Sequence, residues 1–375
     1  MTYYTNIYDS STMTFTKGYI TLDGCIITSI ADTCGGDYTD YSGYYAVPGF
    51  VDIHTHGGAN VDLSDPYDVD FARISDYYLS HGVTTYLPST TSCTHAELVS
   101  SIGLIKAEVA KQHEKAHARV VGVHIEGPYI NPKKAGAHDL AKIRTPKPED
   151  IDELIALTEG MAVYMTIAPE IDGALETIRK TTACGWRITL GHTEGTTEQI
   201  YEGIAAGGSN FTHTFNAMTP LHHRSAGPVG VALTADTCAE LICDGVHVVP
   251  EIARLLYLAK GSDKLVIVSD SMQAAGMPEG VYVLGGVKVT VKGGQALIGQ
   301  TLAGSVTNLH DEMKNLMKFA KISLEQAIPC VTANPAKAAG IYDKVGSLEV
   351  GKFADVVFLD EKYDIVRVIA DSIVS

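Results

Sequence analysis

From Val47 onward, short apolar runs alternate with longer helix-like segments, and this alternation most constrains the fold. Eight runs are candidates for buried strands: 47–53, 83–87, 119–125, 163–168, 187–190, 209–212, 240–243 and 265–269. Helices are expected at 67–81, 96–117, 149–159, 172–184, 196–206, 250–260, 305–320 and 323–339, whereas the loop at 218–238 is expected to fall short of a full helix. Strands that alternate with helices pair in parallel and are covered on both faces. Eight such units predict an α/β protein with a (β/α)8 TIM-type barrel rather than an open sheet.

The two ends of the chain have a different texture, that of short β-strands. Residues 17–32 predict two strands around the turn at Asp23-Gly24, and Val345–Leu348 and Ala354–Leu359 predict two more near the other end. Neither end alone can bury a core. We therefore expect residues 1–47 and 341–375 to form one small β-sandwich domain beside a barrel domain that spans residues 48–340.

One insertion interrupts the barrel pattern. Residues 277–300 alternate apolar and polar residues around Gly285-Gly286, which predicts a β-hairpin. Because it follows the last barrel strand, it could cover the mouth of the barrel as a lid. A surface hairpin without a role is an equal alternative on the sequence alone.

The composition narrows the class of partner. A formal net charge of −16 argues against nucleic acid or an anionic membrane as partner, but not against a small anionic substrate that meets a local cation. The seven cysteines are scattered without a C-x-x-C pair, which is typical of reduced thiols. The N-terminus has no signal-peptide pattern, and no apolar run approaches the ~20 residues of a membrane helix. We expect a cytoplasmic protein.

Metal-ligating side chains follow several of the predicted strands. In a parallel barrel, chemistry gathers where the strands end and the following loops begin. The residues at these places are His54 and His56 after the first strand, Glu126 after the third, His192 after the fifth, His213 after the sixth and Asp270 after the eighth. Residues i and i+2 of a strand face the same side, so His54 and His56 can point to one ion.

Each of these residues has an ordinary alternative role when it is taken alone. A single histidine after a strand is more often a hydrogen-bonding residue, Glu126 could be a loop acid, and Asp270 could cap a helix. His124, which shares a strand face with Glu126, is interpreted as a packing or supporting residue. The shared position at strand ends favours a metal site for the set. Histidine and carboxylate ligands suit Zn²⁺ best, and Fe²⁺, Mn²⁺ or Co²⁺ would also fit.

The motifs PGFVDIHTHG, GVHIEGPY, LGHT, THTFNAM, CDGVHV, VSDSM and LAGS, in this order, resemble the amidohydrolase superfamily. The resemblance spans roughly residues 46–340. Within the superfamily, HIEGPY, FNAM and the CDGVH segment resemble the family that deacetylates N-acetylglucosamine-6-phosphate. The resemblance implies metal-dependent hydrolysis of this phosphosugar to glucosamine-6-phosphate and acetate, in amino-sugar catabolism and cell-wall sugar recycling.

The resemblance also assigns roles near the metal. Glu126, His192 and His213 are implied ligands of a principal ion, and His54 and His56 of a second ion that Glu126 can bridge. Some members of this family lack the two histidines of the first strand, so one ion or two per subunit remain open. Asp270 is implied as a metal-site residue and as the general acid/base. Together with His138, which is implied to contact the acetyl group, it makes up the catalytic pair.

Further residues are implied to bind the substrate. Besides His138, these are Ala137, Asn216, Ala217, Arg224, His247, Leu302, Ala303 and Gly304. Asn216 and Ala217 would offer backbone N–H groups to the phosphate, and Arg224 a planar guanidinium. The resemblance implies a homodimer in which Arg224 reaches the site of the neighbouring subunit.

Two other readings stay open. A sister amidohydrolase, a deacylase or deaminase acting on another amide or nucleobase, would share barrel and metals. Many cyclic amidohydrolases bridge their metals with a carboxylated lysine on the fourth strand, but VYMTIAPE has no lysine. A non-catalytic scaffold protein of the same fold would usually lose metal ligands, and here all expected ligands are present.

Overall fold

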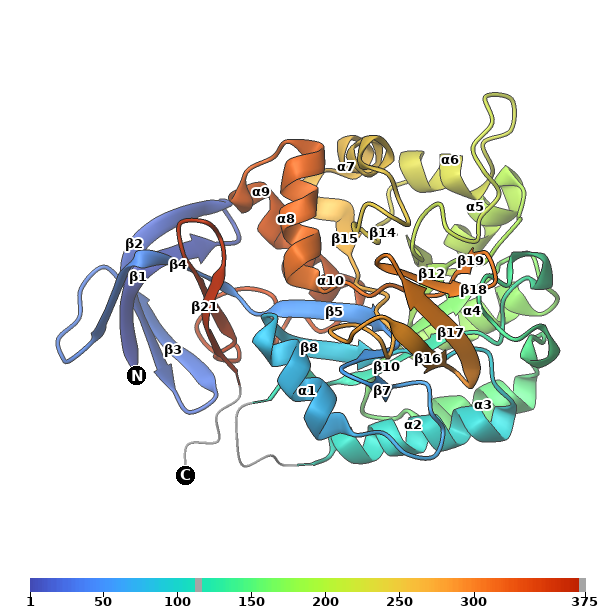
Figure 1. The fold of residues 1–375 in the computed structure, drawn as a ribbon, viewed down its shortest axis with the longest axis horizontal. Coiled ribbons are helices and arrows are strands. Elements are labelled where there is room, and N and C mark those ends of the chain that lie inside the picture. The colour runs from blue at the N-terminus through green and yellow to red at the C-terminus, as the bar shows by residue number, and fades with distance from the viewer. Residues whose placement is uncertain (112–116, 371–375) are drawn as a thin grey trace.

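Eight parallel strands form the centre of the protein in the computed structural model, which describes residues 1–111 and 117–370 (Figure 1). They are β5 (Phe50–Thr55), β8 (Val83–Pro88), β10 (Gly122–Glu126), β11 (Ala162–Ile167), β12 (Arg187–Leu190), β13 (Gly208–Phe211), β14 (Ala239–Leu241) and β15 (Leu265–Ile267). Each overlaps the corresponding run predicted from the sequence. The first prediction begins too early, because β4 continues to Pro48 and β5 starts at Phe50.

Hydrogen bonds connect these strands beyond the ladders of each sheet. The ladders join β5 to β8, β10 to β13 through β11 and β12, and β14 to β15. A parallel bridge between Ser89 and His124 links the ends of β8 and β10. The Asp270 N–H donates to His54 O at 2.9 Å and links the end of β15 back to β5. This arrangement is of the TIM-barrel type, and it brings the ends of the strands to one edge.

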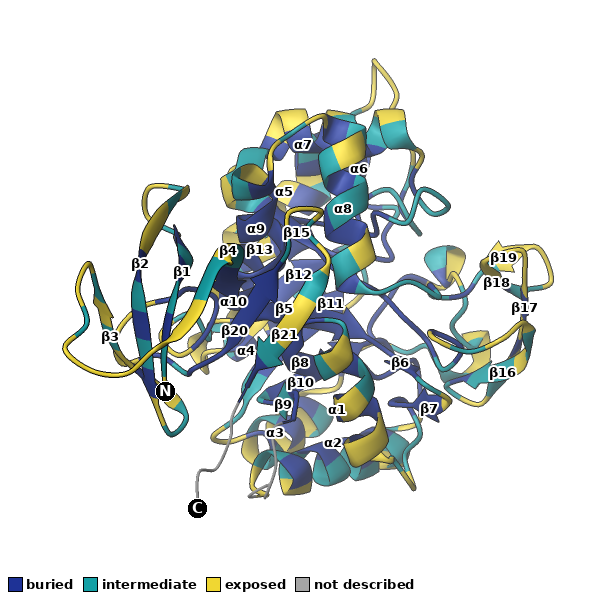
Figure 2. Ribbon diagram, turned by 60° about the vertical axis from the view of Figure 1, so that its left-hand side comes forward, coloured by how far each residue is buried: buried dark blue, intermediate teal, exposed yellow. Residues whose placement is uncertain are grey.

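Helices surround the strands and turn their apolar sides inward. They are α1 (Phe71–Ser80), α2 (His95–Val109), α3 (Pro148–Leu157), α4 (Ala174–Ala183), α5 (Thr197–Ala206), α6 (Gly227–Thr234), α7 (Pro250–Lys264), α8 (Leu309–Ala320), α9 (Leu324–Val331) and α10 (Ala333–Ala338). Capping boxes fix the starts of α2, at Thr94 and Glu97, and of α5. Figure 2 shows buried strands in the centre and exposed residues on the outer helix faces.

Three helix predictions need correction. The single helix expected at 323–339 is divided into α9 and α10, because the backbone leaves the helical region at Thr332, with φ of −131° and ψ of −83°. We expected no full helix within 218–238, but α6 forms there, since Pro228 is tolerated in a first turn and the helix is buried along most of its length. Helix α2 ends at Val109 rather than at residue 117. Residues 112–116 of that prediction lie outside the described residues.

Both ends of the chain contribute strands to one sheet. Its strands are β1 (Thr2–Asp9), β2 (Thr14–Asp23), β3 (Ile26–Ala31), β4 (Thr39–Pro48), β20 (Val356–Leu359) and β21 (Ile365–Ile369), in the order β21-β20-β4-β1-β2-β3. The predicted strand Val345–Leu348 is wrong. This segment instead wraps the buried Lys352 ammonium, which donates to Tyr342 O and Ser347 Oγ, both at 2.6 Å.

The insertion after the last barrel strand is an antiparallel sheet. Its strands are β16 (Gly280–Leu284), β17 (Val287–Lys292), β18 (Gln295–Ile298) and β19 (Thr301–Leu302). The predicted hairpin is therefore confirmed as β16–β17 and extended by two further strands. The shorter elements of the chain are β6 (Gly57–Gly58), β7 (Val61–Asp62), β9 (Arg119–Val120), η1 (Pro132–Lys134) and η2 (Leu140–Lys142).

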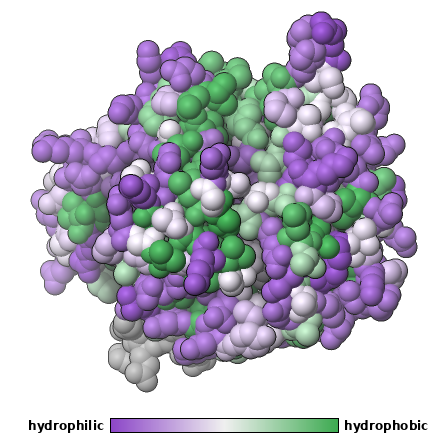
Figure 3. All heavy atoms as spheres, turned by 45° about the vertical axis from the view of Figure 1, so that its right-hand side comes forward, coloured by the Kyte–Doolittle hydropathy of each residue, from purple (hydrophilic) through white to green (hydrophobic). Residues whose placement is uncertain are grey.

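The surface mixes residue types. On the face shown in Figure 3, hydrophobic residues gather in the middle and toward the top, and hydrophilic residues surround them. Within residues 1–111 and 117–370, none of the helices has the length and apolar character required to cross a membrane.

Candidate active site

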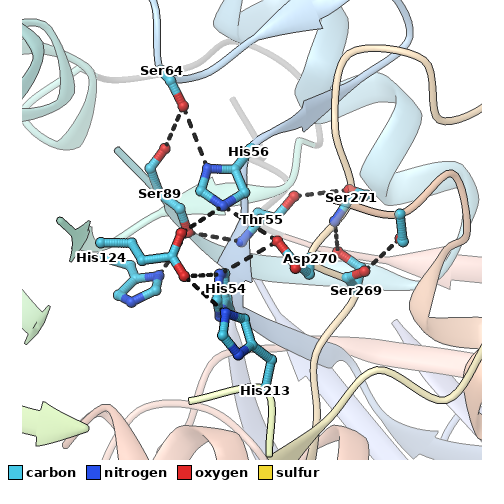
Figure 4. Close-up of polar contacts among 12 residues, drawn as sticks. His54, Thr55, His56, Ser64, Ser89, His124, His213, Ser269, Asp270 and Ser271 are labelled. Carbon is cyan, nitrogen blue, oxygen red and sulfur yellow. Dashed lines mark hydrogen bonds and ion pairs between the residues drawn. The ribbon is translucent and has the colours of Figure 1, made fainter. Parts of the chain in front are cut away.

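Four imidazole rings converge on the buried carboxylate of Glu126 at the edge where the strands end. The Nε2 atoms of His192 and His213 lie 3.2 and 3.1 Å from Glu126 Oε1. From the first strand, His54 Nε2 lies 3.4 Å from the same oxygen, and His56 Nε2 lies 3.1 Å from Oε2. Figure 4 shows His54, His56 and His213 pointing toward this common centre. The sequence prediction that these strand ends meet is therefore confirmed.

The electrostatics of Glu126 follow from this surrounding. Burial alone would raise the pKa of the carboxyl group. The charge of His54 and hydrogen bonds from His138, His192 and His213 outweigh burial and hold the pKa well below its usual range. Glu126 is therefore a carboxylate with both oxygens turned toward nitrogen atoms, as a bridging ligand requires.

The donor set fits a divalent metal ion. Two groups of three ligand atoms lie within 4.8 Å of one another, His54 with His56 and Glu126, and Glu126 with His192 and His213. His54 Nε2 is buried and has no hydrogen-bond partner among residues 1–111 and 117–370. The Nε2 atoms of His192 and His213 face each other at 3.1 Å. A cation would satisfy these nitrogen atoms, and imidazole with carboxylate is a ligand set for Zn²⁺, Fe²⁺, Mn²⁺ or Co²⁺.

Asp270 lies beside the two histidines of the first strand. Its Oδ1 is 3.3 Å from His56 Nε2 and 3.4 Å from His54 Nε2. Burial opposes ionisation, but the charge of His54 and the hydrogen bond from His56 lower the pKa of Asp270 to about 2. Asp270 is therefore ionised at neutral pH and can accept a proton.

Backbone strain is concentrated at this edge. His192, His213 and Asp270 have φ values of 48°, 25° and 44°, and Ala217 has φ of 51°. Non-glycine residues rarely adopt positive φ, and such conformations cluster at functional sites. The loops that follow three of the strands are thus held in conformations that turn ligand side chains toward the centre.

His138 approaches the same carboxylate from the loop between η1 and η2. Its Nδ1 accepts the Ser92 N–H at 2.9 Å, and its Nε2 lies 3.3 Å from Glu126 Oε2. With Nδ1 occupied as an acceptor, the neutral ring carries its proton on Nε2. Burial lowers the pKa of His138, which keeps the ring neutral. The His138 Nε2–H can therefore donate to a group in the site.

A cavity of about 290 Å³ opens above the converging side chains. Predicted site residues that line it are His56, Glu126, Ala137, His138, His192, His213, Asn216, Ala217, His247, Asp270, Leu302 and Gly304. His247 is held by Asp244 Oδ2 at 2.7 Å from its Nδ1. The backbone N–H and the side-chain amide of Asn216 both contact His213 O, so these two donors are directed to their own chain.

Three predicted residues lie outside the cavity wall. His54 is fully buried beneath it. Ala303 is packed among apolar residues of the inserted sheet, and its N–H donates to Ala296 O at 3.0 Å. Arg224 is exposed on the loop before α6, where its Nη1 contacts His223 Nε2 at 2.7 Å. A single chain therefore does not bring Arg224 to the site.

The inserted sheet forms one wall of the cavity. Leu284, Gly285 and Gln300 line it together with Thr91. None of these four residues was predicted from the sequence as a site residue. The Gly285 N–H donates to Asp62 Oδ2 at 2.9 Å, which ties the β16–β17 turn to the barrel. The available signal was the Gly-Gly pair of the predicted hairpin turn, since both Gly285 and Gly286 have positive φ, 55° and 85°.

His124 is correctly interpreted as a packing residue. Its Nδ1 and Nε2 lie 2.8 Å from the hydroxyl oxygens of Ser89 and Thr166, so both ring nitrogens are used. Its ring packs edge-on against His54 at a centroid distance of 4.3 Å. It supports the site from below and has no free nitrogen for a metal.

The fold and the converging ligands define a metal-dependent hydrolase of the TIM-barrel type. The amidohydrolase family model matches residues 45–374, and this chain belongs to that family. An N-acetylglucosamine-6-phosphate deacetylase of Bacillus subtilis (strain 168) is 36% identical, over 86% of this chain and 82% of that protein. An N-acetylgalactosamine-6-phosphate deacetylase of Escherichia coli O157:H7 is 34% identical, over 84% and 83%. The solved structure of an N-acetyl-D-glucosamine-6-phosphate deacetylase mutant from Mycobacterium smegmatis, in complex with N-acetyl-D-glucosamine-6-phosphate, has a TM-score of 0.91 at 30% identity and covers 99% of this chain and 98% of that one.

Proposed function

We propose that this protein hydrolyses the N-acetyl group of N-acetylglucosamine-6-phosphate to glucosamine-6-phosphate and acetate. The observation that carries the proposal is the convergence of Glu126, His192 and His213 with Asp270 at the floor of one cavity. Several relatives that are similar over most of the chain are N-acetylglucosamine-6-phosphate deacetylases, and this supports the substrate class. In this role the protein acts in amino-sugar catabolism and cell-wall sugar recycling.

A divalent ion, when bound, supplies a Lewis acid that acidifies water and polarises a carbonyl. Glu126, His192 and His213 would hold the principal ion, and His54 and His56, again with Glu126, would hold a second ion. Asp270 takes a proton from the attacking water, since it is ionised at neutral pH. It then gives this proton to the departing amine, which leaves poorly without it. The His138 Nε2–H donates a hydrogen bond to the acetyl oxygen and holds it in place.

Acetate release tests this function directly. We expect purified protein to release acetate from N-acetylglucosamine-6-phosphate, to lose the activity after chelation and to regain it with Zn²⁺, Fe²⁺, Mn²⁺ or Co²⁺ added singly. Zn²⁺ is the metal best matched to the ligands. Full activity of a preparation without metal would refute the proposal. Metal analysis of the same samples gives the number of ions per subunit.

We infer that the phosphate and the sugar contact the loop after β13 and the neighbouring cavity wall. We assign the Ala217 backbone N–H, the second hydrogen of the Asn216 side-chain amide and His247 to the phosphate and sugar, and Ala137 and the segment 302–304 to contacts made mostly through the backbone. Arg224 would reach the site of the second subunit in a homodimer. Sedimentation velocity measures the dimer. Arg224→Ala should raise KM for the phosphorylated sugar far more than for N-acetylglucosamine, and equal effects would remove Arg224 from phosphate recognition.

N-Acetylgalactosamine-6-phosphate is a second candidate substrate, because a relative that is 34% identical carries that name. The two sugars differ only in the configuration at C4. Comparison of kcat/KM for both phosphosugars separates the candidates, since a site that hydrogen-bonds one hydroxyl rejects the epimer. We expect the glucosamine derivative to be preferred, and a higher kcat/KM for the galactosamine derivative would reverse the assignment.

We also infer the finer architecture and location. Residues 48–340 form a closed (β/α)8 barrel with the insertion near 277–300 as a lid, and residues 1–47 and 341–375 form a small β-sandwich. The sheet shared by both ends supports this division. The protein is cytoplasmic, in keeping with a phosphorylated sugar substrate, and fractionation of cells with an antibody against the protein tests this location.

A further inference from the structure

A carboxylate that the mechanism does not use lies directly beneath the metal ligands. Glu240 is in the middle of β14 and is completely buried. Its Oε2 lies 3.0 Å from His54 Nδ1 and also accepts the backbone N–H of His213 at 3.0 Å. Its Oε1 accepts the hydroxyl of Tyr164 at 2.5 Å. A buried carboxylate is tolerated only when hydrogen-bond donors surround it. Glu240 has three such donors, from the His54 ring, the His213 backbone and the Tyr164 hydroxyl.

The bond to His54 decides which ring nitrogen carries the proton. Because Glu240 Oε2 is an acceptor, His54 Nδ1 is the donor and carries hydrogen. In the neutral ring, the form that binds a metal, the lone pair of His54 is then on Nε2. This atom is the one that faces Glu126 Oε1 and Asp270 Oδ1, both at 3.4 Å. Imidazole binds a metal through an unprotonated nitrogen, so Glu240 sets His54 in the tautomer that can bind.

The partner of the other first-strand histidine is different. His56 Nδ1 lies 3.4 Å from the hydroxyl of Ser64, which itself donates to Ser89 O at 3.1 Å. A hydroxyl is a neutral and weaker acceptor than a carboxylate. Of the two histidines, His54 is therefore the one whose orientation and basicity a charged partner controls.

The same carboxylate also holds the loop of a ligand of the principal ion. His213 has a φ of 25°, which is strained for a histidine, and Glu240 accepts its N–H. Burial and the neighbouring Glu240 raise the pKa of Tyr164 well above its usual range, so its hydroxyl stays protonated and donates. Glu240 thus fixes one histidine through its ring and another through its backbone.

We propose that Glu240 is a positioning residue which orients His54 and sets the affinity of the metal position that His54 and His56 form. The proposal rests on the metal ligands assigned under the proposed function. The position formed by His54 and His56 is then a metal-binding site, because Glu240 on β14 supplies a charged partner for the His54 ring. The test concerns metal binding without substrate, so a failure of the deacetylase assignment leaves its outcome unaffected.

The test measures Co²⁺ binding to metal-free protein by visible absorption and by metal analysis. Wild-type protein should bind two ions per chain. Glu240→Gln keeps the shape of the side chain and removes its charge, and it should weaken the His54 position about 10–100-fold. The position formed by Glu126, His192 and His213 should change less than about threefold, because the side-chain oxygen of glutamine can still accept the His213 N–H. Tyr164→Phe is the matched control, since it removes one donor and keeps the charge, and both affinities should stay within about threefold.

A double-mutant cycle separates positioning from a general structural effect. If Glu240 acts through His54, Glu240→Gln should have no further effect on Co²⁺ binding in a His54→Gln background. Equal weakening with and without His54, or unchanged binding of both ions by Glu240→Gln, overturns the proposal.

A measurement on the wild-type protein covers the case in which Glu240→Gln does not fold. In ¹⁵N-histidine NMR spectra of protein loaded with Zn²⁺, the His54 signals, assigned with His54→Gln, should show hydrogen on Nδ1. Hydrogen on Nε2 of His54 refutes the proposal.

Discussion

Replacement of Asp270 by asparagine tests the centre of the proposed mechanism. The backbone at this position has φ of 44°, a left-handed conformation that asparagine tolerates better than most residues. Its N–H donates to His54 O at 2.9 Å and its carbonyl accepts the Ser305 N–H at 2.7 Å, and both bonds are independent of the side chain. We therefore expect Asp270→Asn to fold like the wild type.

The expected loss comes from the proton transfers. An amide cannot accept the proton of the attacking water or return it to the amine. Asp270 is only 7% exposed, so bulk water cannot easily replace it as base. A general acid/base contributes about 10²–10⁴-fold, which is about 3 to 5 kcal/mol of barrier at 1.36 kcal/mol per factor of ten. We expect kcat to fall by this factor while KM changes little.

The assay is steady-state acetate release, with metal content measured on the same samples. Asp139→Asn is a matched control, because Asp139 also lines the cavity, yet its carboxylate caps η2, and asparagine caps equally well. This control should keep kcat within about threefold. If Asp270→Asn also stays within threefold with unchanged metal, the assignment of Asp270 as general acid/base is refuted.

Three further predictions concern the cavity wall formed by the inserted sheet, the pH dependence of metal binding and the stability of the apolar core. Gly285→Ala would place a Cβ 2.0 Å from Thr91 Oγ1 and should displace the β16–β17 turn and raise KM, whereas Gly286→Ala, which also has positive φ but meets nothing within 4 Å, should leave KM nearly unchanged. Burial would lower the pKa of His56, but the neighbouring carboxylates raise it to about 9 in the metal-free protein. At any pH below this value, metal binding must displace a proton from His56. In Co²⁺ titrations, the affinity should therefore fall about tenfold for each unit by which the pH is lowered, per displaced proton. An affinity that does not change with pH would contradict this prediction. Leu190→Ala removes a fully buried side chain of the apolar core and should lower the free energy of unfolding in urea by about 2–5 kcal/mol.

The ligands could be found from the sequence because apolar strands deliver them. Each run is short and buried, so the first polar residue after it is fixed in space, and the parallel topology puts these residues at one edge. His54, Glu126 and His213 were predicted on this basis and meet as expected. The prediction needed only the order of the strands, not their distances.

Residues that act from inside a strand were harder to find. Glu240 stands within the apolar run AELIC, and a charged residue in a buried strand is a signal that was not used. Its partners come from β5, β11 and the loop after β13, and only the folded structure brings these together. Helix α6 was missed because Gly227, Pro228 and Gly230 lower helix propensity, although burial stabilises the helix.

The sheet shared by both ends has a consequence for synthesis on the ribosome. Strand β4 pairs with β1 on one side and with β20 on the other, where Pro48 lies opposite Val356. At about 5–20 residues per second, the second neighbour emerges tens of seconds after the first. During this interval β4 is an open edge that can pair with other nascent chains. Arrested chains that stop before Val356 should therefore be cleaved readily by protease in β1–β4, and protection of these strands would show that the edge is covered in another way.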